Sequence, residues 1–429
     1  MSMRVNTNSA LKNDNMESPK LRRLPYPYKA AVSICNDIDE TSDIEHFVKI
    51  TEFLCTKRNT SLGRGLGLRI SNTFFPFHPS DVSLMNGTEK TRQVIVDFIR
   101  SGLIDCMHSY GEKEGFSRRD ASMVLEYLTK KDCYIETWVD HSRNVSNIGI
   151  HLTKGEGANK SSDAYHLDLT RDYGIKFYWL GSITRFPVQE TNLQMRHLSC
   201  LFETRDNPWG YLREISKESC KVVLGKLGIG RFVVFGSNKL IHVCRTQDGS
   251  RIYEFIRACY HPSGVGTGAT AQGLRYSISP NILDFLVDCH GISIIYTHLA
   301  KSKNVDHPFQ EEDIKALRLF KTKNETGEIW IATTSELLNF LTVRDHIAVT
   351  QNFQNETLVI DIGLIHDQIL GDISPNLKNI GGLTIYIPNI SQIDVRLMGR
   401  TVKGVLRNPP DESGAHSISL PFSEWGYPL

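Results

Sequence analysis

The chain has 429 residues, 40% of them hydrophobic, so it can bury a large core and is longer than one barrel domain normally needs. Its formal net charge is +1, from 49 basic and 48 acidic residues, which excludes an overall field that would recruit nucleic acid. No segment is apolar for long enough to cross a bilayer and the start of the chain lacks a signal-peptide core, so we expect a cytoplasmic protein, with peripheral binding at the inner membrane face as a further option.

Residues 1–28 are rich in Asn, Ser, Lys and Arg and are expected to form a flexible tail. Over residues 29–348, strand-like apolar runs alternate with amphipathic stretches, which predicts a parallel α/β sheet closed into a barrel. The expected strands are 30–34, 66–70, 103–107, 133–139, 176–180, 232–235, 292–297 and 329–332. The expected helices include 281–287, 311–320 and 335–341, the last opened by the capping hydroxyls of Thr333–Ser335.

Residues 349–429 show a different pattern. The runs at 358–362, 383–387 and 393–397 are short and β-branched, and Gly, Pro and Asn turns separate them. We therefore expect a small all-β module that resembles a sandwich.

The nine cysteines show no C-x-x-C spacing. Cys35, Cys106, Cys133 and Cys259 lie in or beside apolar runs, so they are interpreted as reduced, buried thiols.

Five acid and imidazole side chains lie at or just past the ends of widely separated apolar runs, which is how a barrel assembles an active site. They are Asp37, Asp39, His108, His141 and His298. Two carboxylates and three imidazoles at one rim would make a metal site with an acid and a base beside it.

The spacing of Asp37 and Asp39 allows both carboxylates to face one cavity, because alternate residues of an extended chain point the same way. One would bind a metal and the other would act as a base. The alternative is that both, with Glu40, open the following helix and complement its dipole.

His108 has a carboxylate, Glu112, four residues on, a spacing that brings two ligands together if the segment turns helically. A buried His bonded to a backbone carbonyl is the alternative.

Another apolar run ends in Trp138, Asp140 and His141. An aromatic ring beside titratable groups is typical of a sugar site, where the ring stacks on the sugar. Asp140 would act directly in catalysis or orient a neighbouring imidazole. The alternative is a strand end with incidental polar residues.

His298 follows the β-forming run Ile294–Thr297 and could protonate a departing amine, or simply cap a loop. Trp179, Arg185 and Arg257 are candidates for lining a polar substrate cleft, although surface loops would also explain them.

In their order along residues 29–345, these motifs resemble the polysaccharide deacetylase (NodB-homology) family, whose members fold as distorted (β/α) barrels and remove N-acyl groups from sugars with a divalent metal. Asp37-Ile38-Asp39 is similar to the spaced acidic pair of the branch that deformylates lipid-linked aminosugars, His108-Ser109 to the start of H-[ST]-x-x-H, and His298 to the final strand–His motif. Two features depart from the family: Glu112 replaces the second His, and no Arg-x-Pro segment stands at Trp138–Ser142.

The resemblance implies hydrolysis of an N-acetyl or N-formyl group on a small-molecule or lipid-linked aminosugar. Asp39, His108 and His141 would hold Zn²⁺ or a related ion, with Glu112 as an alternative ligand, Asp37 as the base and His298 as the acid. Trp138 and Trp179 would stack on the sugar, with Arg185 and Arg257 beside them. The alternatives are a carbohydrate-binding protein without turnover, and a glycoside hydrolase that uses Asp37 and Asp140.

Overall fold

The computed structural model describes residues 18–191, 208–302 and 304–429, and its internal contacts divide the chain into two units. The larger unit comprises Pro27–Asn339 and Glu424–Leu429; the smaller comprises the chain up to Tyr26 and Phe340–Ser423. The sequence predicts a boundary after residue 348, whereas the division falls inside helix α10 (Thr334–His346).

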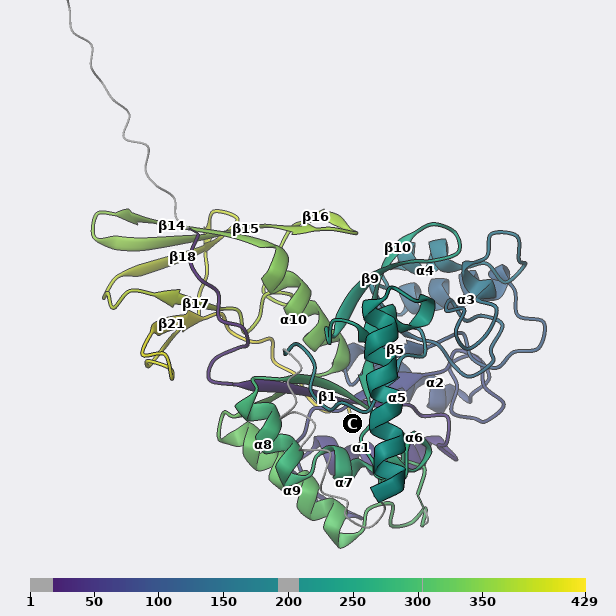
Figure 1. The fold of residues 1–429 in the computed structure, drawn as a ribbon. Coiled ribbons are helices and arrows are strands. Elements are labelled where there is room, and N and C mark those ends of the chain that lie inside the picture. Colours follow the sequence, from purple (N-terminus) through teal and green to yellow (C-terminus); the bar gives the residue numbers. More distant parts are fainter. Residues whose placement is uncertain (1–17, 192–207, 303) are drawn as a thin grey trace, which may run out of the picture. The chain divides into compact units, whose positions relative to one another are not determined.

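The larger unit is a mixed α/β fold built on one curled sheet, parallel in all its pairings except β9 with β10 (Figure 1). Ten strands follow the order β8-β11-β12-β1-β4-β5-β6-β7-β10-β9, and β13 also pairs with β1. Among the described residues the end strands β8 and β9 do not pair, so the sheet is an open half-barrel.

The strands of this sheet are β1 (Ala30–Asn36), β4 (Ser71–Phe74), β5 (Ile104–His108), β6 (Thr137–Val139), β7 (Phe177–Trp179), β8 (Ile183–Thr184), β9 (Ile241–Arg245), β10 (Arg251–Phe255), β11 (Arg257–Ala258), β12 (Ile292–Thr297) and β13 (Ile329–Ile331). A separate hairpin joins β2 (Asn59–Thr60) to β3 (Gly63–Arg64). β1 is buried along its whole length, as expected of a central parallel strand covered on both faces.

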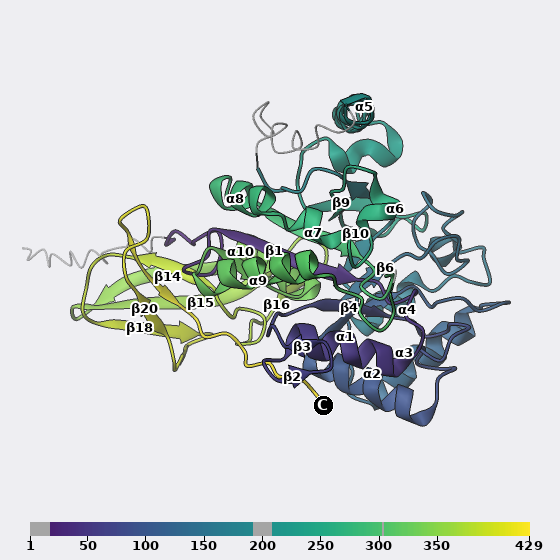
Figure 2. The ribbon, with the colours of Figure 1, turned by 90° about the horizontal axis from the view of Figure 1, so that it is seen from below.

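The helices of this unit are α1 (Ile44–Cys55), α2 (Glu89–Ser101), α3 (Arg118–Lys130), α4 (Leu167–Tyr173), α5 (Pro208–Lys226), α6 (Val265–Gly268), α7 (Leu274–Ser277), α8 (Pro280–Asp288) and α9 (Glu311–Glu325), with 3-10 turns η1 (Glu156–Ala158) and η3 (Gly230–Phe235). Helix α2 shows how local sequence sets the bounds. The Thr88 side chain accepts a hydrogen bond from Thr91 N at the start, and Gly102 ends the helix with φ 77°. Figure 2 shows α1, α2 and α3 on one side of the strands.

Several expected elements are confirmed, and two strands are wrong. The runs at 292–297 and 329–332 match β12 and β13, and the helices expected at 281–287, 311–320 and 335–341 lie within α8, α9 and α10. Residues 66–70 form no strand, because Leu66 N and Leu68 N bond to carbonyls at the end of α1 and the strand starts at Ser71. The run at 232–235 belongs to η3 instead of a strand.

The smaller unit includes the second half of α10, and its strands form two sheets. The five-stranded sheet contains β14 (Ile347–Gln354), β15 (Thr357–Asp367), β16 (Gly371–Ile373), β18 (Ile393–Leu397) and β19 (Arg400–Thr401), and the three-stranded sheet contains β17 (Thr384–Ile387), β20 (Leu406–Asn408) and β21 (His416–Ser419). Their core includes Leu358, Ile360, Ile385, Val395 and Ile418.

The expectation of a tail over residues 1–28 is wrong for its described part. Leu21 pairs with Ile385, and Arg22 N donates a hydrogen bond of 2.8 Å to Thr384 O. These pairings make residues 18–26 part of the smaller unit. Residues 1–17 lie outside the described part of the chain.

In the described part of the chain, Cys35, Cys106, Cys133 and Cys259 are buried free thiols, as predicted. The described helices include none with the length and apolarity needed to cross a bilayer.

Candidate metal and acid–base site

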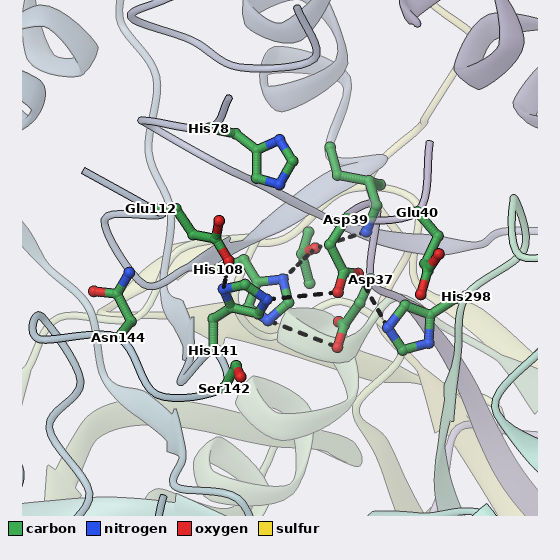
Figure 3. A network of polar contacts seen from close by, with 12 residues as sticks. Asp37, Asp39, Glu40, His78, His108, Glu112, His141, Ser142, Asn144 and His298 are labelled. Atoms are coloured by element: carbon green, nitrogen blue, oxygen red, sulfur yellow. Dashed lines mark hydrogen bonds and ion pairs between the residues drawn. The ribbon is translucent and has the colours of Figure 1, made fainter. Parts of the chain in front are cut away.

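Neighbouring strands of the larger unit deliver the candidate residues to one edge of the sheet. Asp37 follows β1, His108 is the last residue of β5, His141 follows β6 by one residue, and His298 follows β12 directly. Because these strands are parallel, their carboxyl ends meet at the same edge. We call Asp37, Asp39, His108, His141 and His298 the rim cluster; Figure 3 shows its imidazoles approaching the two carboxylates from opposite sides.

Asp37 is held by a buried ion pair. Its Oδ1 accepts a hydrogen bond of 2.8 Å from Arg257 Nη1, and both side chains are almost fully buried. The guanidinium carbon of Arg257 lies 3.7 Å from the ring centre of Trp179 and 4.3 Å from that of Tyr296. The two rings and the Asp37 carboxylate thus hold the Arg257 cation in place beside Asp37.

Asp39 connects two of the imidazoles. Its Oδ1 lies 3.0 Å from His298 Nε2, an ion-pair contact outside hydrogen-bond geometry, and its Oδ2 lies 3.6 Å from His141 Nε2. Burial alone raises the pKa of Asp39, but these contacts outweigh burial and hold that pKa well below its usual range. Asp39 is therefore ionised at neutral pH.

His298 has a different role from the other imidazoles. Its Nδ1 lies 3.2 Å from Ala269 O, where it donates, so Nε2 must also carry a proton to pair with Asp39. Burial lowers the pKa of His298, but the Asp39 contact raises it by more, and the net pKa is above its ordinary value. His298 is thus the member of the rim cluster suited to donate a proton.

His108 and His141 lie side by side. Their ring centres are 4.7 Å apart, and Phe75 stacks on His108 at 4.6 Å. Burial lowers the pKa of His108 to about 3, against the opposing charge of Asp37, whose Oδ2 lies 3.8 Å from His108 Nε2. A neutral imidazole with an available nitrogen is the form that binds metals.

The backbone after both imidazoles adopts an uncommon conformation. Ser109 has φ 47° and Ser142 has φ 42°, both in the left-handed region that non-glycine residues rarely occupy. Gly111 has φ 80°, and a Cβ there would lie 1.7 Å from Phe77 O. Such strain persists where surrounding structure enforces it, and it concentrates at functional sites.

The donor set suits a divalent metal. One carboxylate and two imidazoles are the ligands that zinc enzymes use, and Asp39 Oδ1 and His141 Nδ1 are buried with no hydrogen-bond partner among the described residues. Donor atoms on a tetrahedral ion are about 3.4 Å apart, near the 3.6 Å between His141 Nε2 and Asp39 Oδ2. No group of three or more His, Cys, Asp or Glu side chains in the described ranges already has metal-centre spacing, so the ligands would have to close around an ion.

Two predicted residues do not join the rim cluster. The Asp140 carboxylate accepts hydrogen bonds from Trp138 Nε1 (2.7 Å), Ile148 N (3.0 Å) and Gly149 N (2.8 Å), and burial raises its pKa to about 6. Trp138 is fully buried. Asp140 therefore braces a loop, and Trp138 is a core residue instead of a sugar platform.

The expected substrate-binding residues are also used internally. Trp179 packs on Arg257 and donates to Ser182 O, and Arg257 pairs with Asp37. The Arg185 guanidinium donates to His261 O, and its side chain is buried. Glu112 is half exposed, and its Oε1 lies 3.8 Å from His141 Nδ1, so it adjoins the cluster without facing Asp39.

Sequence reasoning missed the residues that support the imidazoles. Phe75 contacts His78, His108 and His141, and Thr73 Oγ1 lies 3.4 Å from His108 Nδ1. The sequence indicates Tyr296 only as part of a strand, whereas its ring packs on Arg257. The position of Thr73 and Phe75 at the end of a strand next to β5 was the available signal, and placing that strand at 66–70 hid it.

In comparisons with known proteins, the chain matches no family model, no curated protein and no solved structure.

Proposed function

We propose that this chain is a metal-dependent amidohydrolase that removes an N-acetyl or N-formyl group from an aminosugar, on a distorted (β/α) barrel of the NodB-homology type. The observation that carries the proposal is the rim cluster, in which five predicted residues from four strands contact one another at one sheet edge. The sugar and acyl parts of the proposal, and a lipid-linked form of the substrate, rest on the family resemblance.

Asp39, His108 and His141 would hold the divalent ion, Zn²⁺ being the first choice for these donors. When bound, such an ion polarises a carbonyl oxygen and lowers the pKa of a water molecule. The remaining exposure of the cluster lies at Asp39, with 20% of its side chain accessible, and His141, with 11%, so substrate would approach from that side.

Asp37 would accept the proton of the attacking water, because Arg257 holds its carboxylate in place and it shares the cluster with the proposed ligands. His298 Nε2 would then protonate the amine as the C–N bond breaks. The Nδ1 contact with Ala269 O fixes the ring so that Nε2 faces Asp39. Base and acid thus come from adjacent strands, β1 and β12.

A direct test measures bound metal by elemental analysis, and acetate or formate release from N-acylated aminosugars, before and after chelation and supply of Zn²⁺ or Co²⁺. Asp39→Asn should lose both metal and turnover. Asp81→Asn, an exposed site of the same unit, is the matched control and should lose neither. Full turnover by Asp39→Asn would overturn the assignment.

One observation favours a second candidate, a carbohydrate-binding protein without turnover. Glu112 stands where the resembled motif has its second His, and it lies half exposed beside His141 instead of facing Asp39. This candidate predicts glycan binding with no metal uptake after Zn²⁺ or Co²⁺ is supplied. A glycoside hydrolase is not supported, because the Asp140 carboxylate is bonded to Trp138 and to loop amides.

A further inference from the structure

Helix α5 ends in a tip that exposes apolar side chains. The chain leaves α5 at Lys226, turns, and returns through η3, and Figure 2 shows α5 at the periphery of the larger unit. We define the tip patch as Val223, Lys226, Leu227, Ile229, Arg231 and Val233. Its four aliphatic side chains are 56%, 68%, 46% and 49% exposed, respectively. Four such residues within the eleven positions 223–233 are more than the scattered single exposures normal for a protein surface.

The tip is a defined structure with internally paired amides. Leu227 N donates to Val223 O, Gly228 N to Gly225 O, and Ile229 N to Leu224 O, each at 3.0 Å. Gly225 lets the two arms approach, since a Cβ there would lie 2.4 Å from Phe232 O. Paired backbone groups matter because an unpaired amide is costly to move into an apolar medium.

Along the sequence, the charged residues of the tip and of the segment that follows it are basic, and Lys221, at the start of this stretch, pairs with Glu218 at 2.6 Å. Between Ser219 and Gln247 the sequence has no Asp or Glu, while Lys or Arg stands at positions 221, 226, 231, 239 and 245. The whole chain carries a net charge of only +1, so this stretch is a local concentration of positive charge. Lys226 and Arg231 are exposed and flank Leu227 and Ile229 directly.

The combination points to a lipid surface. Aliphatic side chains flanked by cations are the composition of segments that lie in a bilayer interface, where cations meet anionic headgroups. Single-stranded nucleic acid would instead call for exposed aromatic rings on which bases stack. We infer that the tip patch docks on an anionic membrane surface, with Leu227 and Ile229 entering the headgroup–acyl boundary and Lys226 and Arg231 at lipid phosphates. This inference stands independently of the proposed hydrolase activity.

The test is co-sedimentation of the full chain with vesicles of phosphatidylcholine alone and of phosphatidylcholine with 30% phosphatidylserine (about one anionic lipid in three). We expect binding to the anionic vesicles that weakens with added salt. Leu227→Ser/Ile229→Ser and Lys226→Glu/Arg231→Glu should each weaken it by about tenfold or more. The matched control, Met123→Ser/Lys130→Glu on α3, changes one exposed apolar and one exposed charged residue and should bind like the parent.

Equal binding to both vesicle types, no binding to either, or unchanged binding by both tip variants would overturn the inference. Concentration-dependent self-association abolished by Leu227→Ser/Ile229→Ser, without vesicle binding, would assign the tip patch to a contact between copies of the chain instead. Circular dichroism of each variant establishes that a loss of binding is not a loss of folding.

Discussion

Arg257 Nη1 donates a 2.8 Å hydrogen bond to Asp37 Oδ1, although 220 residues separate the two along the chain. Both side chains are buried, and Arg257 Nε and Nη2 have no hydrogen-bond partner among the described residues. Arg257 therefore places a positive charge beside the proposed base. Loss of either partner would leave the other charge buried without compensation, which lowers the free energy of unfolding.

Arg257→Met should destabilise the fold by about 3–5 kcal/mol, because it leaves the Asp37 carboxylate buried without its cation. The double substitution Asp37→Asn/Arg257→Met should lower the free energy of unfolding by clearly less than the sum of the losses of the two single substitutions, because neither charge then remains. Urea unfolding of the four proteins measures this cycle. Additive costs would show that the two side chains do not stabilise each other.

Asn36 ties the ends of the central strands together beside the rim cluster. Its Oδ1 accepts a hydrogen bond of 2.7 Å from Leu299 N, and its Nδ2 donates one of 2.8 Å to Asn72 Oδ1. Asn36 directly precedes Asp37 in the chain, and Leu299 directly follows His298. Asn36→Leu should cost about 1–3 kcal/mol, because a buried amide loses its acceptor. Asn86→Leu, in an exposed turn, should cost much less in the same unfolding measurement. Equal losses would contradict a positioning role for Asn36.

Gly111 should resist substitution more than a nearby glycine of similar conformation. Gly111 (φ 80°) would place a Cβ 1.7 Å from Phe77 O, whereas Gly115 (φ 63°) has nothing within 4 Å. Gly115→Ala should cost about 1–2 kcal/mol from its backbone conformation alone. Gly111→Ala should cost more and also shift the His108–Glu112 segment. Thermal unfolding of both variants checks this, and a smaller loss for Gly111→Ala would be contradictory.

His166 should make stability depend on pH. The side chain is fully buried, with Nε2 2.7 Å from Ser146 O, and burial lowers its pKa from 6.5 to about 4. Because the folded state keeps His166 neutral, its contribution is complete above pH 6.5 and is lost as pH falls to about 4. The loss approaches about 3 kcal/mol, from a shift of about 2.5 pKa units.

His166→Gln removes this titration and should flatten the stability curve in that pH window, whatever the variant's absolute stability. Denaturant unfolding between pH 4 and pH 7 measures the two slopes. An identical pH dependence for parent and variant would show that His166 does not titrate as its burial requires.

Sequence periodicity predicts the strands that end in candidate site residues more accurately than it predicts the segments that connect them. β12 is a continuous run of β-forming residues that delivers His298, so its pattern and position were readable. Residues 66–70 also contribute buried aliphatic side chains, at Leu66, Leu68 and Ile70, but Leu66 N and Leu68 N bond to α1 carbonyls. A hydrophobic run shows that a segment is buried and leaves its hydrogen-bond partner undetermined.

The contacts that hold the candidate site residues in place could not be predicted from the sequence, for a related reason. The sequence suggests a substrate-binding role for Arg257, and only the fold shows that it pairs with Asp37 and packs on the rings of Trp179 and Tyr296. Asp140 follows a strand as a catalytic residue would, yet its oxygens point to Trp138 Nε1 and to loop amides. Residue type and strand position predict where a side chain starts, while long-range packing decides what it contacts.

The most direct test of the central claim is a crystal soaked in Zn²⁺, with anomalous diffraction measured at the zinc edge. We expect one strong peak bonded to Asp39, His108 and His141, with His298 outside the bonded set and Asp37 beside it. A peak at Glu112 and His141 that excludes His108, or no ordered zinc within reach of Asp39, would contradict it.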